Sequence, residues 1–366
     1  MPLTRRAFGQ LIGAGAAAAT FSPRLAWSAP STRRGNGIVR LSANENPYGP
    51  SPAAINAMRD AFGEASRYPD DEADLLVADV AKLHDVSTGS VILGDGSSEI
   101  LKLVAAAFTS PSRKLIMASP TFEAIGHYAK VTNADIVNIP LDANYAHDVV
   151  KMAAVADAGV IYICNPNNPT GSITPAAALR SLIESANPST IILVDEAYHH
   201  YAASPAYESV IPMIASRPNL IVARTFSKIY GMAGLRAGYA IAQPDVVKNL
   251  DAQKAWDSMN LMALVAARAS LADTAHVAEG RKKNAETKRD LLARLGKLGY
   301  KVVPSETNFV MIDLGREVKP VIGALRERKV QVGRLFPAMP KHLRVTIGTP
   351  EEMERFMEAF AGVVRS

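Results

Sequence analysis

Residues 224–239, RTFSKIYGMAGLRAGY, place a lysine where it could do chemistry. Lys228 directly follows Ser227 at the end of an apolar run, and Arg236 comes eight residues later. We expect this lysine to be partly buried beside a cationic group, and both conditions lower the pKa of its amine toward neutrality. A neutral amine can attack a carbonyl carbon and form an imine. The stretch therefore predicts a reactive lysine with neighbouring side chains that can bind an anion.

Three other apolar runs end in polar residues that could bind a ligand. They are GDGSSE with Gly96, Ser97 and Ser98, CNPNNPTG with Asn168, and VDEAY with Asp195 and Tyr198. The free N–H groups at the start of a helix favour an anion, which suits the Gly-Ser-Ser turn. Each motif alone is weak, since such residues are common in turns. If the run ends meet, they combine an anion cradle, an amide, a carboxylate, a phenol and an amine.

These groups suit a phosphorylated aromatic cofactor better than a metal. The histidines closest to ligand spacing are His199 and His200, and adjacent side chains point in different directions. Pyridoxal 5′-phosphate (PLP) would use every group, because Lys228 can form the imine and Asp195 can pair with the ring nitrogen. Asn168 and Tyr198 could then donate to a ring oxygen.

The pattern of elements predicts how these residues are positioned. Apolar β-branched runs alternate with helical patterns up to about residue 262, which predicts an α/β fold with a mostly parallel sheet covered on both faces. Ligands of such sheets bind beyond the carboxyl ends of the strands. We predict an N-terminal arm at 30–47, a large cofactor-binding domain at 48–262 and a smaller α+β C-terminal domain at 263–366.

Composition restricts the function further. The 366 residues carry a formal net charge of +5, of which Arg5, Arg6 and Arg24 supply three charges within the first 29 residues. The remaining +2 is too small to indicate nucleic acid or an anionic membrane as a partner. Cys164, the single cysteine, lies in an apolar strand pattern, where packing is the expected role.

The first 29 residues resemble a twin-arginine export signal. Arg5 and Arg6 are followed by Phe8, a weakly apolar Ala/Gly stretch and small residues near Ser28. The apolar run is too short for a membrane span of about 20 residues. We expect a periplasmic or exported protein, with cleavage near Ser28, or a cytoplasmic one if the signal is not used.

The ordered motifs together resemble a known family. SANENPYGPSP, GDGSSEI, CNPNNPTG, VDEAY, RTFSKIYGMAGLRAGY and LRVTIGTPEE look like the class I/II, fold-type I PLP-dependent aminotransferases, and most like their histidinol-phosphate branch. The resemblance runs from about residue 39 to the C-terminus. It implies transfer of an amino group between an amino acid, or a histidinol-phosphate-like amine, and a 2-oxo acid through a Lys228 aldimine.

By this resemblance, catalysis falls to Lys228, Asp195 and Tyr198. The implied cofactor contacts are Gly96, Ser97, Ser98, Phe122, Asn168, Asp195, Tyr198, Ser227, Lys228 and Arg236. Tyr68 resembles a tyrosine that reaches the cofactor phosphate of a neighbouring subunit, which implies a homodimer with shared sites. The implied substrate contacts are Arg344 for the α-carboxylate, Arg334 as a second anion site, and Asn44 and Asn308 as pocket-lining residues.

Two departures leave the substrate open. The histidinol-phosphate enzymes usually carry a Pro-Tyr segment before NENP and an acidic residue after DEAY, whereas this chain has STRRGNG and His199 there. Other functions on the same scaffold are a PLP-dependent decarboxylase and a PLP-binding regulator. Carbon dioxide release would mark the decarboxylase, and such regulators carry a basic DNA-binding domain ahead of the fold.

Overall fold

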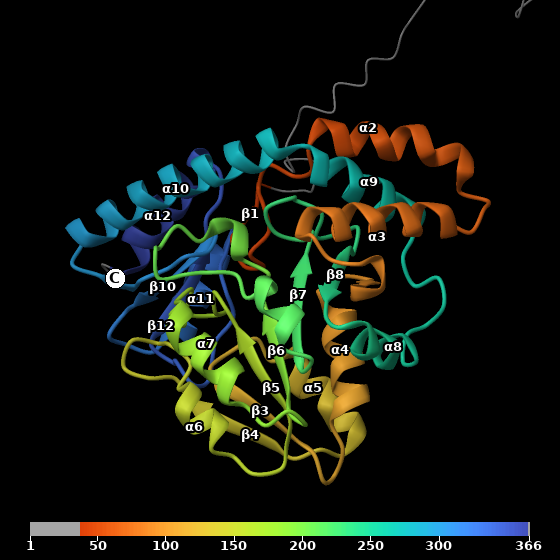
Figure 1. Ribbon diagram of the computed structural model, residues 1–366. Coiled ribbons are helices and arrows are strands. Elements are labelled where there is room, and N and C mark those ends of the chain that lie inside the picture. The colour runs from red at the N-terminus through yellow and green to blue at the C-terminus, as the bar shows by residue number, and fades with distance from the viewer. Residues whose placement is uncertain (1–36, 365–366) are drawn as a thin grey trace, which may run out of the picture. The chain divides into compact units, whose positions relative to one another are not determined.

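A seven-stranded sheet forms the centre of the computed structural model, which describes residues 37–364 (Figure 1). The predicted export signal lies outside the described residues. The strand order is β2-β8-β7-β6-β5-β3-β4. The bounds are β2 Val91–Gly94, β3 Lys114–Ser119, β4 Ile136–Pro140, β5 Ala158–Cys164, β6 Ile191–Asp195, β7 Leu220–Thr225 and β8 Gly238–Ile241. Only β8 runs against its neighbours in this sheet, so the predicted mostly parallel α/β sheet is confirmed.

Helices cover both faces of this sheet, which explains the continuous apolar strand sequences. In β6, Ile192 and Val194 pack on one face, while Ile191 and Leu193 pack on the other. The first face is covered by α2 (Pro52–Ala61), α3 (Asp70–His84), α6 (Val149–Ala153), α7 (Ala176–Ser185) and α9 (Leu261–Ala272). The second face is covered by α4 (Ser97–Phe108), α5 (Ala124–Ala129) and α8 (Pro244–Asp251).

The C-terminal part has its own apolar core around a three-stranded antiparallel sheet. Its elements are α10 (Thr274–Lys297), β9 (Lys301–Val303), β10 (Phe309–Asp313), α11 (Val318–Glu327), β11 (Val330–Gln331), β12 (His342–Thr346) and α12 (Pro350–Val364). The short strand β1 (Val39–Arg40) pairs parallel with β11, and Val39 and Leu41 are buried in the same core. Residues 39–41 therefore pack in the C-terminal core, ahead of the segments that form the large sheet.

The helical region after residue 262 is broken in two at Asp273. The Asp273 carboxylate accepts a hydrogen bond from the N–H of His276 and so starts α10 as its N-cap. Between residues 37 and 364, none of the helices alone has the length and apolarity needed to cross a membrane, while α9 and α10, bent by 81°, meet those criteria only as a pair. Five residues of α9 are buried in the fold.

A buried ion pair lies behind the ends of the central strands. The Arg224 Nη2 atom on β7 is 2.7 Å from Oε2 of Glu196, and both side chains are almost fully buried. Glu196 also accepts hydrogen bonds from the hydroxyl of Ser209 and the N–H of Val210. Every oxygen of this buried carboxylate is thus satisfied, and removing the guanidinium would leave a buried charge without its counter-ion.

We predict that Arg224→Met lowers the free energy of unfolding by about 3–5 kcal/mol, because Glu196 stays buried and unpaired. The measurement is urea unfolding of the variant beside the wild type. Arg180→Met is the matched control, since its ion pair with Glu208 is exposed on both sides and should contribute less than about 1 kcal/mol. Equal losses in the two variants would contradict the prediction.

Candidate active site

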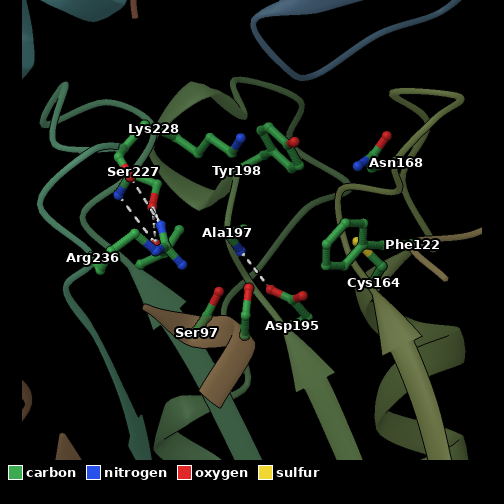
Figure 2. A pocket seen from close by; sticks show the side chains of 13 residues that line it. Ser97, Phe122, Cys164, Asn168, Asp195, Ala197, Tyr198, Ser227, Lys228 and Arg236 are labelled. Carbon is green, nitrogen blue, oxygen red and sulfur yellow. Dashed lines mark hydrogen bonds between the residues drawn. The ribbon is translucent and has the colours of Figure 1, made fainter. Parts of the chain in front are cut away.

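The carboxyl ends of the central parallel strands meet around one pocket of about 150 Å³ (Figure 2). The predicted residues that line it are Ser97, Ser98, Phe122, Asn168, Asp195, Tyr198, Ser227, Lys228 and Arg236. Figure 2 shows Ser227 and Arg236 on one side of the cavity and Phe122 and Asn168 on the other. Segments as distant as 97 and 236 therefore supply one site, as the convergence of strand ends requires.

The Ser227 side of the pocket is built to hold an anion. Helix α4 begins after Gly96, which has a φ of +75° and no side chain to cap the first turn. An added Cβ at Gly96 would overlap the Arg236 guanidinium, and one at Gly238 would overlap the N–H of Ser97. Both glycines are needed to let the helix start approach the arginine. The helix N–H groups thus face a positive side chain across a space suited to a phosphate.

Ser227 and Arg236 are held in place for the same purpose. The Thr225 hydroxyl donates to Ser227 Oγ at 2.9 Å, which leaves the Ser227 proton available to a ligand. Arg236 donates from Nη1 to Ser227 Oγ at 3.3 Å and to the Ala233 carbonyl at 3.0 Å. Its backbone has a φ of +61°, a left-handed conformation that is costly for a side chain of this size. This strained backbone conformation directs the guanidinium of Arg236 back into the pocket.

Lys228 extends from the end of β7 toward the N-terminal arm. Its Nζ donates to the carbonyl of Asn44 at 3.2 Å and lies 5.5 Å from the ring centroid of Tyr198. Burial, together with the positive charge of Arg344, lowers the pKa of the Lys228 ammonium to about 8. The neutral, nucleophilic form of this amine is therefore much more abundant near neutral pH than it is for an ordinary lysine, although the ammonium still predominates at pH 7.

Asp195 occupies the floor of the pocket at the end of β6. Its carboxylate accepts hydrogen bonds from the Tyr162 hydroxyl at 3.0 Å and the N–H of Ala197 at 3.1 Å. Burial raises the pKa of Asp195 to about 6, although both hydrogen bonds favour the ionised form. Because neither donor is charged, a positive N–H placed beside Asp195 would stabilise the carboxylate.

The CNPNNPTG turn positions Asn168 through its two neighbouring asparagines. Asn165 bonds to both the N–H and the carbonyl of Thr174, and Asn167 bonds to Pro120 and Thr170. These two side chains are buried and structural, so Asn168 is the one of the three that lines the pocket.

Arg344 does not line the pocket itself but is hydrogen-bonded to Asn168, which does. It donates from Nη1 to Asn168 Oδ1 and from Nη2 to the Ser42 carbonyl, both at 2.7 Å. Its Nε is buried without a hydrogen-bond partner among the described residues. An unsatisfied buried donor is costly, so this guanidinium is suited to donate to an anion that completes its hydrogen bonding.

Asn44 connects the arm to the reactive groups. Its side chain donates to the Tyr198 hydroxyl at 3.0 Å, and its carbonyl accepts from both Lys228 and Asn308. With a φ of 55°, it turns side chain and carbonyl toward the same site. Asn44 therefore contacts Tyr198 and Lys228, which line the pocket, and Asn308 contacts Asn44; neither asparagine lines the pocket itself.

Other predicted residues lie farther from the cavity. Tyr68 is 80 % exposed and does not line the pocket. Arg334 forms an ion pair with Glu123 outside the lining residues. His199 and His200 are neither exposed nor in the pocket: they hydrogen-bond to Tyr207 and Tyr230 respectively. Burial lowers the pKa of His199 to about 3.

Sequence reasoning missed four lining residues, namely Cys164, Ala197, Thr225 and Ala233. Cys164, placed in the apolar core by its strand pattern, is buried as predicted and also contributes to the pocket wall. Thr225 could have been found from its position two residues before Ser227. Ala197 and Ala233 carry no chemical signal in the sequence.

Comparison with known proteins identifies the fold and its chemistry. The model of the aminotransferase class I and II family matches residues 36–360. The chain belongs to this family. It is 39 % identical over 325 residues to the histidinol-phosphate aminotransferase of Symbiobacterium thermophilum, covering 88 % of this chain and 89 % of that protein. It is 37 % identical over 332 residues to that of Moorella thermoacetica, covering 89 % and 86 %.

Solved structures agree with this assignment. A putative histidinol-phosphate aminotransferase from Erwinia carotovora superimposes with a TM-score of 0.87 at 35 % identity, covering 93 % of this chain and 99 % of that one. The Sinorhizobium meliloti histidinol-phosphate aminotransferase, solved in complex with PLP, gives 0.85 at 26 % identity, covering 96 % and 99 %. The protein is a PLP-dependent aminotransferase of fold type I.

The residues of this aminotransferase fit PLP. The start of α4, together with Ser227 and Arg236, supplies neutral and positive donors for the phosphate. Gly96 and Gly238, which have no side chains, allow these donors to come close to one another. Asp195 would face the pyridine nitrogen, and Lys228 supplies the amine. Phe122 lies on the pocket wall, where it could pack against an aromatic ring.

We predict that Lys228 in the apoenzyme reacts with trace acetic anhydride with a half-maximal rate near pH 8, instead of about 10.4 for an unperturbed lysine. The reason is burial, which favours the neutral amine over the ammonium. The measurement is competitive labelling across pH, with the Lys228 peptide quantified by mass spectrometry. Arg344→Gln should raise the midpoint, because a nearby positive charge is lost. A midpoint near pH 10 in the unsubstituted apoenzyme would contradict the account.

Proposed function

We propose that this aminotransferase binds the carboxylate of its amino acid and 2-oxo acid substrates at Arg344 and transfers the amino group at Lys228. The observation that carries the proposal is the unsatisfied Nε of Arg344, a residue whose Nη1 donates to Asn168 in the lining of the pocket that contains Lys228 and Asp195. A planar guanidinium fits a carboxylate with two parallel hydrogen bonds, so the substrate would be oriented as well as held.

The surrounding side chains divide the remaining work. When bound, PLP supplies the carbonyl carbon that takes up the amino group and the ring that withdraws electrons from the substrate carbon. Lys228 Nζ holds and returns the proton that moves between substrate and cofactor carbons, which its lowered pKa permits near neutral pH. Tyr198, whose hydroxyl accepts the hydrogen bond from Asn44, keeps its own hydroxyl proton for donation to a ligand in the pocket.

We further propose a substrate with a second anionic group that approaches Arg334. Arg334 and Arg344 both stack on Phe336, with guanidinium carbons 4.5 and 5.1 Å from the ring centroid. A molecule anchored at Arg344 would therefore find a second positive charge close by. Glutamate, with two carboxylates, fits this description. The curated relatives above are histidinol-phosphate aminotransferases, and a phosphorylated amine of that kind is a second candidate, which would bring a single phosphate to the same pair of arginines.

The donor can be found from single half-reactions. The PLP-loaded enzyme is mixed with glutamate, phenylalanine or histidinol phosphate, and we expect at least one to produce its oxo product together with enzyme-bound pyridoxamine phosphate. Arg344→Gln should raise KM for an α-carboxylate donor by about 10–100-fold, since a charge-assisted hydrogen-bonded pair is lost. Carbon dioxide release without an oxo product would instead indicate the decarboxylase.

We also propose that the enzyme works as a homodimer in which Tyr68 of one subunit completes the site of the other. Tyr68 is 80 % exposed in the single chain, and Phe62, nearby in sequence, is 65 % exposed. Exposed aromatic side chains are enriched at protein interfaces.

Mixed dimers test this arrangement. Lys228→Ala should be inactive and Tyr68→Ala should bind PLP more weakly. After the two variants are unfolded and refolded together, each mixed dimer contains one site with both Lys228 and Tyr68 intact. We predict that the mixture is more active than either variant alone. No recovery, despite mixed dimers seen by native mass spectrometry, would exclude a shared site.

We propose export through the twin-arginine pathway for the Arg5–Arg6 segment. The support is the sequence pattern alone: the arginine pair, Phe8 and the short apolar stretch. Arg5→Lys together with Arg6→Lys should keep the protein in the cytoplasm, as measured by cell fractionation. Equal periplasmic amounts of both forms, or cytoplasmic location of the unsubstituted protein, would contradict it.

A further inference from the structure

An ion pair between Glu123 and Arg334 lies beside the pocket. Arg334 Nη2 is 2.5 Å from Glu123 Oε2, although the two residues are 211 positions apart in the chain. Glu123 directly follows Phe122, which lines the pocket, and precedes α5. Arg334 follows β11 in the C-terminal part. The pair therefore joins the large-sheet side of the site to the side that carries Arg344.

Arg334 is near enough to influence whatever Arg344 binds. The two guanidinium groups share the ring of Phe336 as a packing surface. Burial lowers the pKa of Arg344, and the charge of Arg334 lowers it further, as expected for two neighbouring cations. A ligand held by Arg344 would meet Arg334 as its next positive charge, if Arg334 were unoccupied.

The carboxylate of Glu123 neutralises the positive charge of Arg334. Apart from the ion pair, the guanidinium of Arg334 donates to the carbonyl of Leu335 at 3.1 Å. With the carboxylate in place, the pair carries no net charge, so it offers little attraction to a distal phosphate or carboxylate on a substrate. Both side chains are more than half exposed, which makes the pair weak enough to exchange partners.

We propose that Glu123 is a specificity-determining residue whose carboxylate competes with the anionic side chain of a substrate for Arg334. This inference rests on the proposed binding of the substrate carboxylate at Arg344. Substrates with neutral side chains leave the pair intact. Substrates with a distal anion must displace Glu123, and their affinity is reduced by the stability of the pair.

Glu123→Gln tests the competition because it removes the charge and keeps the shape. The probes are two carboxylates of equal length, glutarate with a distal anion and pentanoate without one, with dissociation constants measured by calorimetry on the PLP-loaded enzyme. We expect Glu123→Gln to bind glutarate about two- to fivefold more tightly, the range set by an exposed ion pair. Pentanoate should bind with unchanged affinity. In turnover, KM for glutamate should fall while kcat stays the same.

Two further variants locate the effect. Adding Arg334→Gln to Glu123→Gln should abolish the gain for glutarate. Glu354→Gln is the matched control: Glu354 is 2.6 Å from Arg294 in another exposed ion pair, between α12 and α10, and its loss should change neither dissociation constant. An equal effect of Glu123→Gln on both probes, no effect, or a gain that survives the loss of Arg334 would overturn the proposal.

Arg344→Gln separates this inference from the proposed function on which it rests. If Arg344→Gln weakens both probes while Glu123→Gln leaves glutarate unchanged, the role of Arg344 stands and that of Glu123 is wrong. If Arg344→Gln weakens neither probe, the carboxylate site is elsewhere and both proposals fail.

Discussion

The site depends on one constraint, the convergence of parallel strand ends at a single edge of the central sheet. Because β5, β6 and β7 run in the same direction, Asn168, Asp195 and Lys228 emerge beside one another although they are far apart in the chain. Burial at this edge then changes their chemistry in opposite directions. It lowers the pKa of the Lys228 ammonium to about 8 and raises that of Asp195 to about 6. A single packing arrangement thus prepares both a neutral amine and a carboxyl group ready to pair with a cation.

The C-terminal part is organised around the same edge. Strand β1 joins the C-terminal core, and the chain then turns at Asn44 so that one residue contacts both Tyr198 and Lys228. Arg344 arrives from β12 and is aligned by Asn168 on the large sheet. Groups that would bind the cofactor and groups that would bind the substrate are therefore connected by direct hydrogen bonds, and a shift of the C-terminal part would move Arg344 relative to Lys228.

Much of this could be predicted from the sequence, because each pocket-lining motif sits at the end of a recognisable apolar strand. The parallel sheet, the helix start at Ser97 and the grouping around Lys228 all follow from local patterns. Contacts between distant segments could not be predicted in this way. The pairing of Glu123 with Arg334 has no local signal, and the hydrogen bond of His199 to Tyr207, outside the pocket lining, is set by tertiary packing. The left-handed backbone of Asn44 and Arg236 is likewise imposed by the surrounding structure.

The central claim is that Lys228 is the residue that carries PLP. The most direct measurement is borohydride reduction of the PLP-loaded enzyme, followed by peptide mass spectrometry. The account predicts a stable pyridoxyl group on the peptide containing Lys228 and on no other lysine peptide. Labelling of a different lysine, such as the partly buried Lys288, or an unlabelled Lys228 in enzyme that is active with PLP, would contradict it.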